Sequence, residues 1–287
     1  MSRRVIGRVE RFDEIDSTNR YLVDAARAGG PSGLVAVARH QTAGRGRLGR
    51  RWQAPPGTNL LLSVLLRSSS SSPSEVTPHD LTLAVALAAA DACAEVAGVE
   101  ARLKWPNDLV VDDGKLAGVL AELVTGVSGD PAVVVGLGLN VGWPAAEPEV
   151  TVPAEPEGTV TAEPEVTVAA EPEGTVAAEP EPPGATSLAV LTGAPVDLDS
   201  LLSAVLEHAD RRIAELLGPE GRSEQLEEYS TRCDTLGREV RIEEQGGSFS
   251  GKAVAVGDAG ELVVETTSGP RTVTAADVVH LRHSGPA

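Results

Sequence analysis

The stretch from Gly44 to Arg51 limits which folds this chain of 287 residues can adopt. It holds four arginines and three glycines in eight residues, although the formal net charge of the chain is −18. Its glycines match the pattern G-x-G-x-x-G of dinucleotide-binding folds, which requires a strand before it, a helix opening at it and an acidic residue about 20 positions later. Residues 34–38 supply the strand, but residues 50–57 indicate a loop, and no acidic residue lies between Asp24 and Glu75. The dinucleotide-binding fold is therefore excluded.

What remains is a basic, glycine-rich loop that suits an anion, because guanidinium groups match the geometry of carboxylates and phosphates. An ordinary exposed turn is the alternative interpretation. The negative net charge argues against non-specific binding to nucleic acid, and we find no secretory signal and no apolar run long enough to span a bilayer. We expect a cytoplasmic protein in which Cys93 and Cys233 are buried, reduced thiols, since their spacing fits no metal site.

Hydrophobic periodicity predicts an α+β protein. Polar side chains at Ser17, Thr18 and Asn19 can cap a helix that ends near residues 29–30. An apolar helix is expected at residues 80–97 and two further helices at 198–217 and 219–233. Strands are expected at residues 9–15, 34–41, 59–67 and 133–141.

A second informative stretch runs from Lys104 to Leu123. Residues 104–108 end a strand in a Pro-Asn-Asp turn, and a hairpin around residues 112–114 returns Lys115 towards that turn. Gly136 and Gly138 leave one face of the strand 133–141 without side chains, which suits a flat ligand.

The composition changes after residue 143. The tetrapeptide Ala-Glu-Pro-Glu recurs at residues 146, 154, 162, 170 and 178, and its ten glutamates account for the difference between −18 and about −8 for the rest of the chain. Because such a repeat cannot bury a core, we predict a disordered insertion at 144–186 within a catalytic domain at 1–234. Short alternating strands then predict a small antiparallel barrel at 235–287.

Five motifs in this order and spacing resemble those of the biotin–protein ligases. They are Ser17-Thr18-Asn19, Gln41-x-x-Gly44-Arg45-Gly46-Arg47-x-Gly49-Arg50-x-Trp52, Lys104-Trp105-Pro106-Asn107-Asp108, Lys115-Leu116-Ala117-Gly118 and Gly136-x-Gly138-x-Asn140. The match covers most of residues 9–142, and the C-terminal barrel resembles the small SH3-like domain of that family. The resemblance implies a mixed β-sheet flanked by helices, as in class II synthetases and biotin–lipoyl ligases.

The resemblance also implies an activity and a site. The family uses ATP to convert biotin to biotinyl-5′-adenylate and then transfers biotin to a lysine of a biotin carboxyl carrier domain of a carboxylase. Mg²⁺ is expected with ATP, and no ligands for it are identified. By resemblance Lys115 and Arg47 are catalytic, and the nucleotide is contacted by Arg50, Trp52, Asn107 and Asn140. The biotin contacts implied are Ser17, Thr18, Asn19, Gln41, Gly44, Arg45, Gly46, Arg47, Lys115 and Gly118.

Two alternatives stay open. A lipoate or octanoate ligase or transferase resembles this fold, and the G-R-G-R sequence of the loop favours biotin over lipoate. A non-catalytic biotin-binding protein would not need both Lys115 and the complete arginine loop. About 15 residues precede Ser17, so we expect no DNA-binding role, while a homodimer stays open. Leu48 departs from the family, in which this loop position is often basic or polar.

Overall fold

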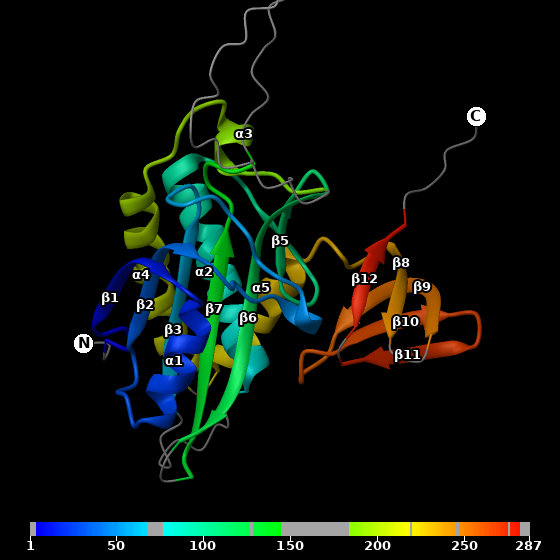
Figure 1. The fold of residues 1–287 in the computed structure, drawn as a ribbon. Coiled ribbons are helices and arrows are strands. Elements are labelled where there is room, and N and C mark those ends of the chain that lie inside the picture. Colours follow the sequence, from blue (N-terminus) through cyan, green and yellow to red (C-terminus); the bar gives the residue numbers. More distant parts are fainter. Residues whose placement is uncertain are drawn as a thin grey trace, which may run out of the picture.

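A seven-stranded mixed β-sheet forms the larger part of the molecule (Figure 1). The computed structural model describes residues 4–67, 77–126, 129–144, 184–218, 220–244, 247–274 and 276–281. The strand order is β1-β2-β3-β7-β6-β5-β4, and only β1 and β2 pair in parallel. The strands are β1 (Val9–Ile15), β2 (Val35–Gln41), β3 (Leu60–Arg67), β4 (Arg102–Lys104), β5 (Asp108–Val111), β6 (Gly114–Thr125) and β7 (Pro131–Leu139). The predicted mixed sheet is therefore confirmed.

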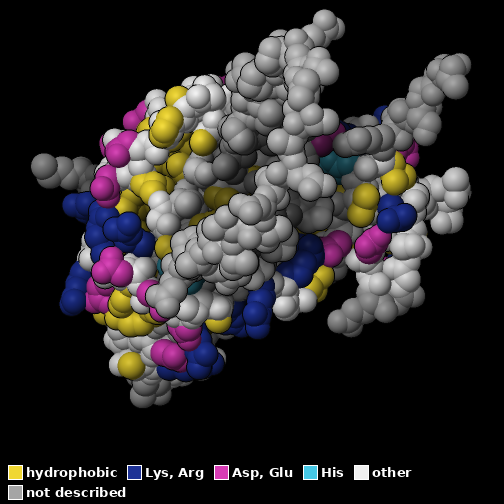
Figure 2. Space-filling view, turned by 45° about the horizontal axis from the view of Figure 1, so that its top comes forward, with side chains coloured by type: hydrophobic (Ala, Val, Ile, Leu, Met, Phe, Trp, Pro, Cys, Tyr) yellow, Lys and Arg dark blue, Asp and Glu magenta, His cyan; other side chains and the backbone are white. Residues whose placement is uncertain are grey.

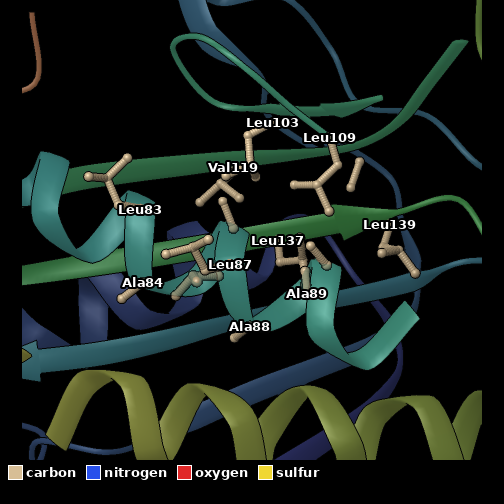
Figure 3. Packing of buried hydrophobic residues seen from close by; sticks show 14 of the residues in the cluster. Leu83, Ala84, Leu87, Ala88, Ala89, Leu103, Leu109, Val119, Leu137 and Leu139 are labelled. Atoms are coloured by element: carbon tan, nitrogen blue, oxygen red, sulfur yellow. The ribbon is translucent and has the colours of Figure 1, made fainter. Parts of the chain in front are cut away.

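Helices cover both faces of this sheet. Helix α1 (Thr18–Arg27) covers one face, and its N-cap is Ser17, as the sequence predicts. Helix α2 (Pro78–Ala97) covers the other face and begins with a capping box between Thr77 and Asp80. It is apolar all round because it lies between the sheet and helix α4 (Leu198–Leu216), so both of its sides are buried (Figure 3).

Two shorter helices complete this part of the chain. Helix α5 (Gly221–Arg232) follows α4 and confirms the second predicted helix. Helix α3 (Leu188–Thr192) is not predicted, since five residues are too few for a helical period to be recognised. Both cysteines are free and buried, and burial raises the pKa of the Cys93 thiol to about 12. No helix in the described ranges is long and apolar enough to cross a membrane.

The C-terminal residues form a separate five-stranded antiparallel sheet of the predicted SH3-like type. Its order is β11-β10-β9-β8-β12. It lies beside α5 and β5 (Figure 1), and the Trp105 indole Nε1 donates to the Gly260 carbonyl at 2.8 Å across the junction. The strands are β8 (Glu239–Glu244), β9 (Gly247–Val256), β10 (Leu262–Thr266), β11 (Gly269–Val273) and β12 (Asp277–His280).

The predicted insertion is shorter at its C-terminal end than the sequence suggested. Residues 184–186 are part of the fold: the Lys115 amide donates to the Gly184 carbonyl at 2.7 Å, and the Thr186 amide donates to the Lys115 carbonyl at 3.0 Å. The repeat itself, at 145–183, lies outside the described residues. Its two ends meet, because the Ser187 hydroxyl donates to the Pro144 carbonyl at 2.6 Å. A composition shift could not locate this boundary, since the pairing partner is Lys115, about 70 residues earlier in the sequence.

Candidate active site

Three glycines leave a bare floor on the face of the large sheet that α1 covers. Gly118 pairs with Gly138 across β6 and β7, and Gly136 lies next to Ser63 of β3. The predicted bare face is present, but the chain covers it with its own Trp52. A Cβ on Gly138 would lie 2.5 Å from the indole Cε2 of Trp52, and a Cβ on Gly118 would lie 3.2 Å from its Cζ3. Glycine is needed here for the indole to approach the sheet.

A polar wall rises from this floor at the start of α1. The Thr18 amide donates to Gln41 Oε1 at 2.8 Å, and the Thr18 hydroxyl lies 2.7 Å from the Ser63 hydroxyl. Asn19 packs on Gly136, where an added Cβ would lie 1.9 Å from Asn19 Oδ1. Ser17, Thr18 and Asn19 are all buried, and Thr18 and Asn19 also contact Ser63, the neighbour of Gly136.

The basic loop closes over this floor as a narrow hairpin. Arg45 and Arg51 form an antiparallel bridge, and the Gly46 amide donates to the Arg50 carbonyl at 2.8 Å. A single 3₁₀ turn, η1 (Arg47–Gly49), forms its tip, where Leu48 has φ of 56° and is exposed. A Cβ on Gly44 would lie 2.2 Å from the Trp52 carbonyl oxygen, so glycine allows the two sides of the hairpin to meet.

Each arginine predicted for the site contacts a different part of the chain. Arg45 Nη1 lies 2.9 Å from a Glu122 carboxylate oxygen of β6. Arg47 Nη1 donates to Asn107 Oδ1 at 3.2 Å and to the carbonyl of residue 276 at 3.5 Å. Arg50 pairs with Asp277 of β12. Burial lowers the pKa of the Arg47 guanidinium, and the carboxylates of Asp277 and Asp108 act in the opposite direction.

Lys115 contacts both the Pro-Asn-Asp turn and Trp52. Its Nζ donates to Asp108 Oδ1 at 2.7 Å and lies 5.6 Å from the centroid of the Trp52 ring. Asp108 is paired with Gly118 across β5 and β6, so the ammonium lies beside the glycine floor. The hairpin predicted from the sequence thus returns Lys115 to the Pro-Asn-Asp turn, where Asn107 contacts Arg47.

Asn140 is placed differently from the other predicted contacts. Its Nδ2 donates to the Lys115 carbonyl at 3.2 Å and to the Thr186 carbonyl at 3.0 Å, while its Oδ1 accepts from Asn59 Nδ2 at 3.0 Å. The side chain is buried and braces the backbone of Lys115. A direct nucleotide contact at Asn140 stays a prediction.

Four polar residues at the site were not among the predicted site residues: Ser63, Asp108, Glu122 and Asp277. Glu122 could have been recognised, because Gly118, Leu120 and Glu122 alternate along β6 and therefore share a face. Asp277 could not, because its contact with the loop depends on how the two sheets meet.

Charged side chains of both signs lie on the face that Figure 2 shows. On the described part of the face in Figure 2, Lys and Arg side chains are interspersed with Asp and Glu and form no continuous basic area. This agrees with the negative net charge.

One group of potential metal ligands occurs among the described residues. Atoms of Asp113, Asp234 and His280 lie within 4.8 Å of one another. Arg238 pairs with Asp113 at 3.1 Å and with Asp234 at 2.8 Å. Because a guanidinium already pairs with both carboxylates and the third group is an imidazole, this group does not fit Mg²⁺, which prefers free oxygen ligands.

Comparison with known proteins gives consistent matches for both parts of the chain. Residues 12–140 match the model of the biotin/lipoate A/B protein ligase family, and residues 235–281 match the biotin protein ligase C-terminal domain. The chain is 35% identical over 271 residues to the biotin–[acetyl-CoA-carboxylase] ligase of Mycobacterium tuberculosis, covering 93% of this chain and 86% of the relative. It is 27% identical to the bifunctional ligase/repressor BirA of Bacillus subtilis, covering 93% of this chain and 72% of the relative.

The fold also matches solved structures. A biotin protein ligase from Aquifex aeolicus, in complex with biotin and ATP, aligns with a TM-score of 0.71 and 24% sequence identity. The alignment covers 95% of this chain and 99% of the other. At this identity the likeness concerns the fold alone.

Proposed function

The chain belongs to the biotin–protein ligase family, and from this premise we propose that it biotinylates a carrier protein in two steps that both use the site around Lys115. In the first step a carboxylate oxygen of biotin attacks the α-phosphorus of ATP, and pyrophosphate leaves. In the second step the amine of an acceptor lysine attacks the acyl carbon of biotinyl-5′-AMP, and AMP leaves as the amine loses a proton. The acceptor is a biotin carboxyl carrier domain of a carboxylase.

The observation that carries this proposal is the grouping of Lys115 Nζ with Asp108, Trp52 and the glycine floor. Two anions must meet in the first step, and negative charge increases on the α-phosphate oxygens as the bond forms. A preorganised ammonium beside a half-buried floor can stabilise that charge without reorienting. Asp108, at 2.7 Å, holds the ammonium in place and can release it to a substrate oxygen.

We assign the other predicted residues roles that are compatible with their positions. Ser17, Thr18 and Gln41 form the polar wall and would bind the ureido ring of biotin. Arg45 and Arg47 would face the biotin carboxylate and the α-phosphate, and Arg50 and Trp52 would lie towards the nucleotide. Mg²⁺, which accompanies ATP, would add charge neutralisation at the phosphate oxygens. A closed loop would also exclude water from the acyl-adenylate.

Lipoate is the main competing substrate, because the first family model covers both classes of ligase. The match of residues 235–281 to the C-terminal domain of biotin protein ligases favours biotin, as do the four arginines of the loop.

The test is biotin-dependent release of pyrophosphate from ATP by the full chain, followed by transfer of labelled biotin to a purified carrier domain. We expect pyrophosphate release with biotin and none with lipoate. Transfer should require the acceptor lysine of the carrier. If pyrophosphate is released with lipoate and not with biotin, lipoate is the substrate. Binding of biotin without pyrophosphate release would indicate a non-catalytic protein.

A further inference from the structure

A continuous chain of hydrogen bonds lies under the polar wall. It runs from Glu122 of β6 through Asn19 and Ser63 to Thr18 and Gln41. Asn19 Nδ2 donates to Glu122 Oε2 at 2.9 Å, and the Ser63 hydroxyl donates to Asn19 Oδ1 at 2.6 Å. Asn19, Ser63 and Thr18 are all buried, so water does not compete for these bonds.

The donor-to-acceptor direction of this chain of hydrogen bonds is fixed at Asn19. Its Nδ2 faces two acceptors, the Leu120 carbonyl at 3.2 Å and Glu122 Oε2 at 2.9 Å. A carbonyl and an ionised carboxylate have no hydrogen to donate, so the amide nitrogen of Asn19 must lie on that side. Asn19 Oδ1 therefore faces Ser63 and accepts its only hydroxyl hydrogen.

The same reasoning fixes Thr18 and Gln41. Since the Ser63 hydrogen is committed, the 2.7 Å contact between the two hydroxyls can only use the hydrogen of Thr18. The alternative acceptor for the Thr18 hydroxyl hydrogen is Gln41 Oε1 at 3.2 Å, which is likewise a protein atom and not a ligand atom. With either partner, Thr18 has only lone pairs left for a ligand. Gln41 Oε1 accepts from the Thr18 amide, so Gln41 keeps its Nε2 hydrogens as donors.

The polar wall therefore offers a ligand one acceptor, the Thr18 hydroxyl, beside one donor, the Gln41 amide nitrogen. A cyclic urea has the complementary pair, an N–H next to a C=O. We propose that Glu122 and Ser63 are positioning residues that set this donor–acceptor order and so select the urea ring of the substrate. The proposal rests on the proposed function. Glu122 has a second task, because its Oε1 holds Arg45 at 2.9 Å, and the experiment must separate the two.

The test compares the affinity for biotin with that for its two cyclic carbamate analogues, in which a ring oxygen replaces one ureido N–H. We expect the intact protein to bind one carbamate about 10–100-fold more weakly than biotin, because an acceptor would face the lone pairs of Thr18. In Glu122→Gln the new amide can donate to Asn19, so the shorter of the two contacts no longer enforces the order and only the Leu120 carbonyl at 3.2 Å still favours it. Biotin should then bind about tenfold more weakly, and the ratio of the carbamate Kd to the biotin Kd should shrink to a few-fold.

Three further variants make the result specific. Thr18→Val removes the lone pairs and keeps the side-chain shape, so the ratio should shrink there too, and this variant decides the question if Glu122→Gln does not fold. Arg45→Gln removes the contact between Glu122 and the loop together with a cation proposed to face the biotin carboxylate, so it should weaken biotin and carbamate equally and keep the ratio of their affinities. Glu14→Gln, at an exposed carboxylate of β1 that pairs with His40, should keep both affinities.

The possible failures are distinct. If the intact protein does not bind biotin, the proposed function is wrong. If it binds biotin but does not discriminate against either carbamate, only the inference is wrong. Equal loss of affinity for biotin and carbamate in Glu122→Gln would also overturn the inference, because Glu122 would then only stabilise the fold.

Discussion

Lys115, Arg45 and Arg50 each contact a carboxylate on a different strand: Asp108, Glu122 and Asp277, respectively. The side chains of Arg45 and Arg50 are 48% and 60% exposed, and exposed ion pairs contribute only about 0–1 kcal/mol to stability. These pairs therefore matter more for position than for stability. We expect an oxygen of a substrate anion to replace the carboxylate of the protein at each cation when the ligand binds.

Lys115→Ala should lower the rate of pyrophosphate release about 10²–10³-fold, because one preorganised charge is lost from the transition state. Biotin should still bind, since the polar wall around Thr18 and Gln41 is untouched. Lys115→Arg should not restore the rate, because a planar guanidinium cannot take the place of a compact ammonium. Calorimetry with biotin and a pyrophosphate assay on the same preparations measure both effects.

Lys252→Ala, at an exposed lysine of β9, is the matched control. Its biotin affinity and its rate of pyrophosphate release should equal those of the unchanged protein. Loss of biotin affinity in Lys115→Ala, with a normal rate at saturating biotin, would make Lys115 a binding residue only. If neither quantity changed, Lys115 would be an ordinary exposed side chain.

The elements themselves were largely predictable from the sequence. Alternation placed β1, continuous apolar runs placed β2, β3 and α2, a helical period placed α4, and capping residues placed the start of α1. The contacts between elements were not predictable, because no local pattern records which strands become neighbours. Glu122 shows the difference: its strand was expected, but its bonds to Asn19 and Arg45 join residues 103 and 77 positions away.

The basic loop should change its dynamics when a ligand binds. Four like charges within residues 44–51 repel one another, and the exposed pairs of Arg45 and Arg50 are too weak to hold the loop closed. Its amides should exchange quickly without ligand and slowly when biotinyl-adenylate is bound. Hydrogen exchange followed by mass spectrometry measures this, with the buried strand β3 as the internal reference. Unchanged exchange in residues 44–51 at saturation would contradict the prediction.

The two sheets join through contacts that bury a histidine. His280 of β12 lies 3.1 Å from the Thr235 hydroxyl, which also accepts from the Trp105 amide at 3.0 Å. The pKa of His280 is lowered to about 4, mainly by burial and also by the charges of Lys104 and Arg238, while the carboxylates of Asp234 and Asp113 oppose the shift. The junction therefore favours the neutral imidazole.

Stability should fall as the pH falls through this range. Unfolded histidine has a pKa of about 6.5, so the unfolded chain binds the proton first. The contribution of His280 is fully present above about pH 6.5 and is lost progressively towards pH 4, by an amount on the order of 3 kcal/mol. His280→Gln should flatten this dependence in denaturant unfolding, whereas His40→Gln, at the exposed pair with Glu14, should not. An equal slope in both variants would exclude His280 as the cause.

The acidic repeat should be dispensable for folding and for adenylate formation. Its two ends are held together independently of it, by the bond from Ser187 to Pro144 and by the pairing of residue 185 with Lys115. Removal of residues 146–181 leaves three residues between Pro144 and Gly184 and changes the formal net charge from −18 to −8, since ten glutamates are lost. A shorter connection between ends that already meet costs little loop entropy. We expect the melting temperature to change by no more than a few degrees and pyrophosphate release to stay near that of the full chain. Exchange of the ten glutamates for glutamine at full length is the matched control, since it changes the charge without changing the length. A loss of many degrees on deletion, with none in the glutamine variant, would show that the repeat packs against the folded chain.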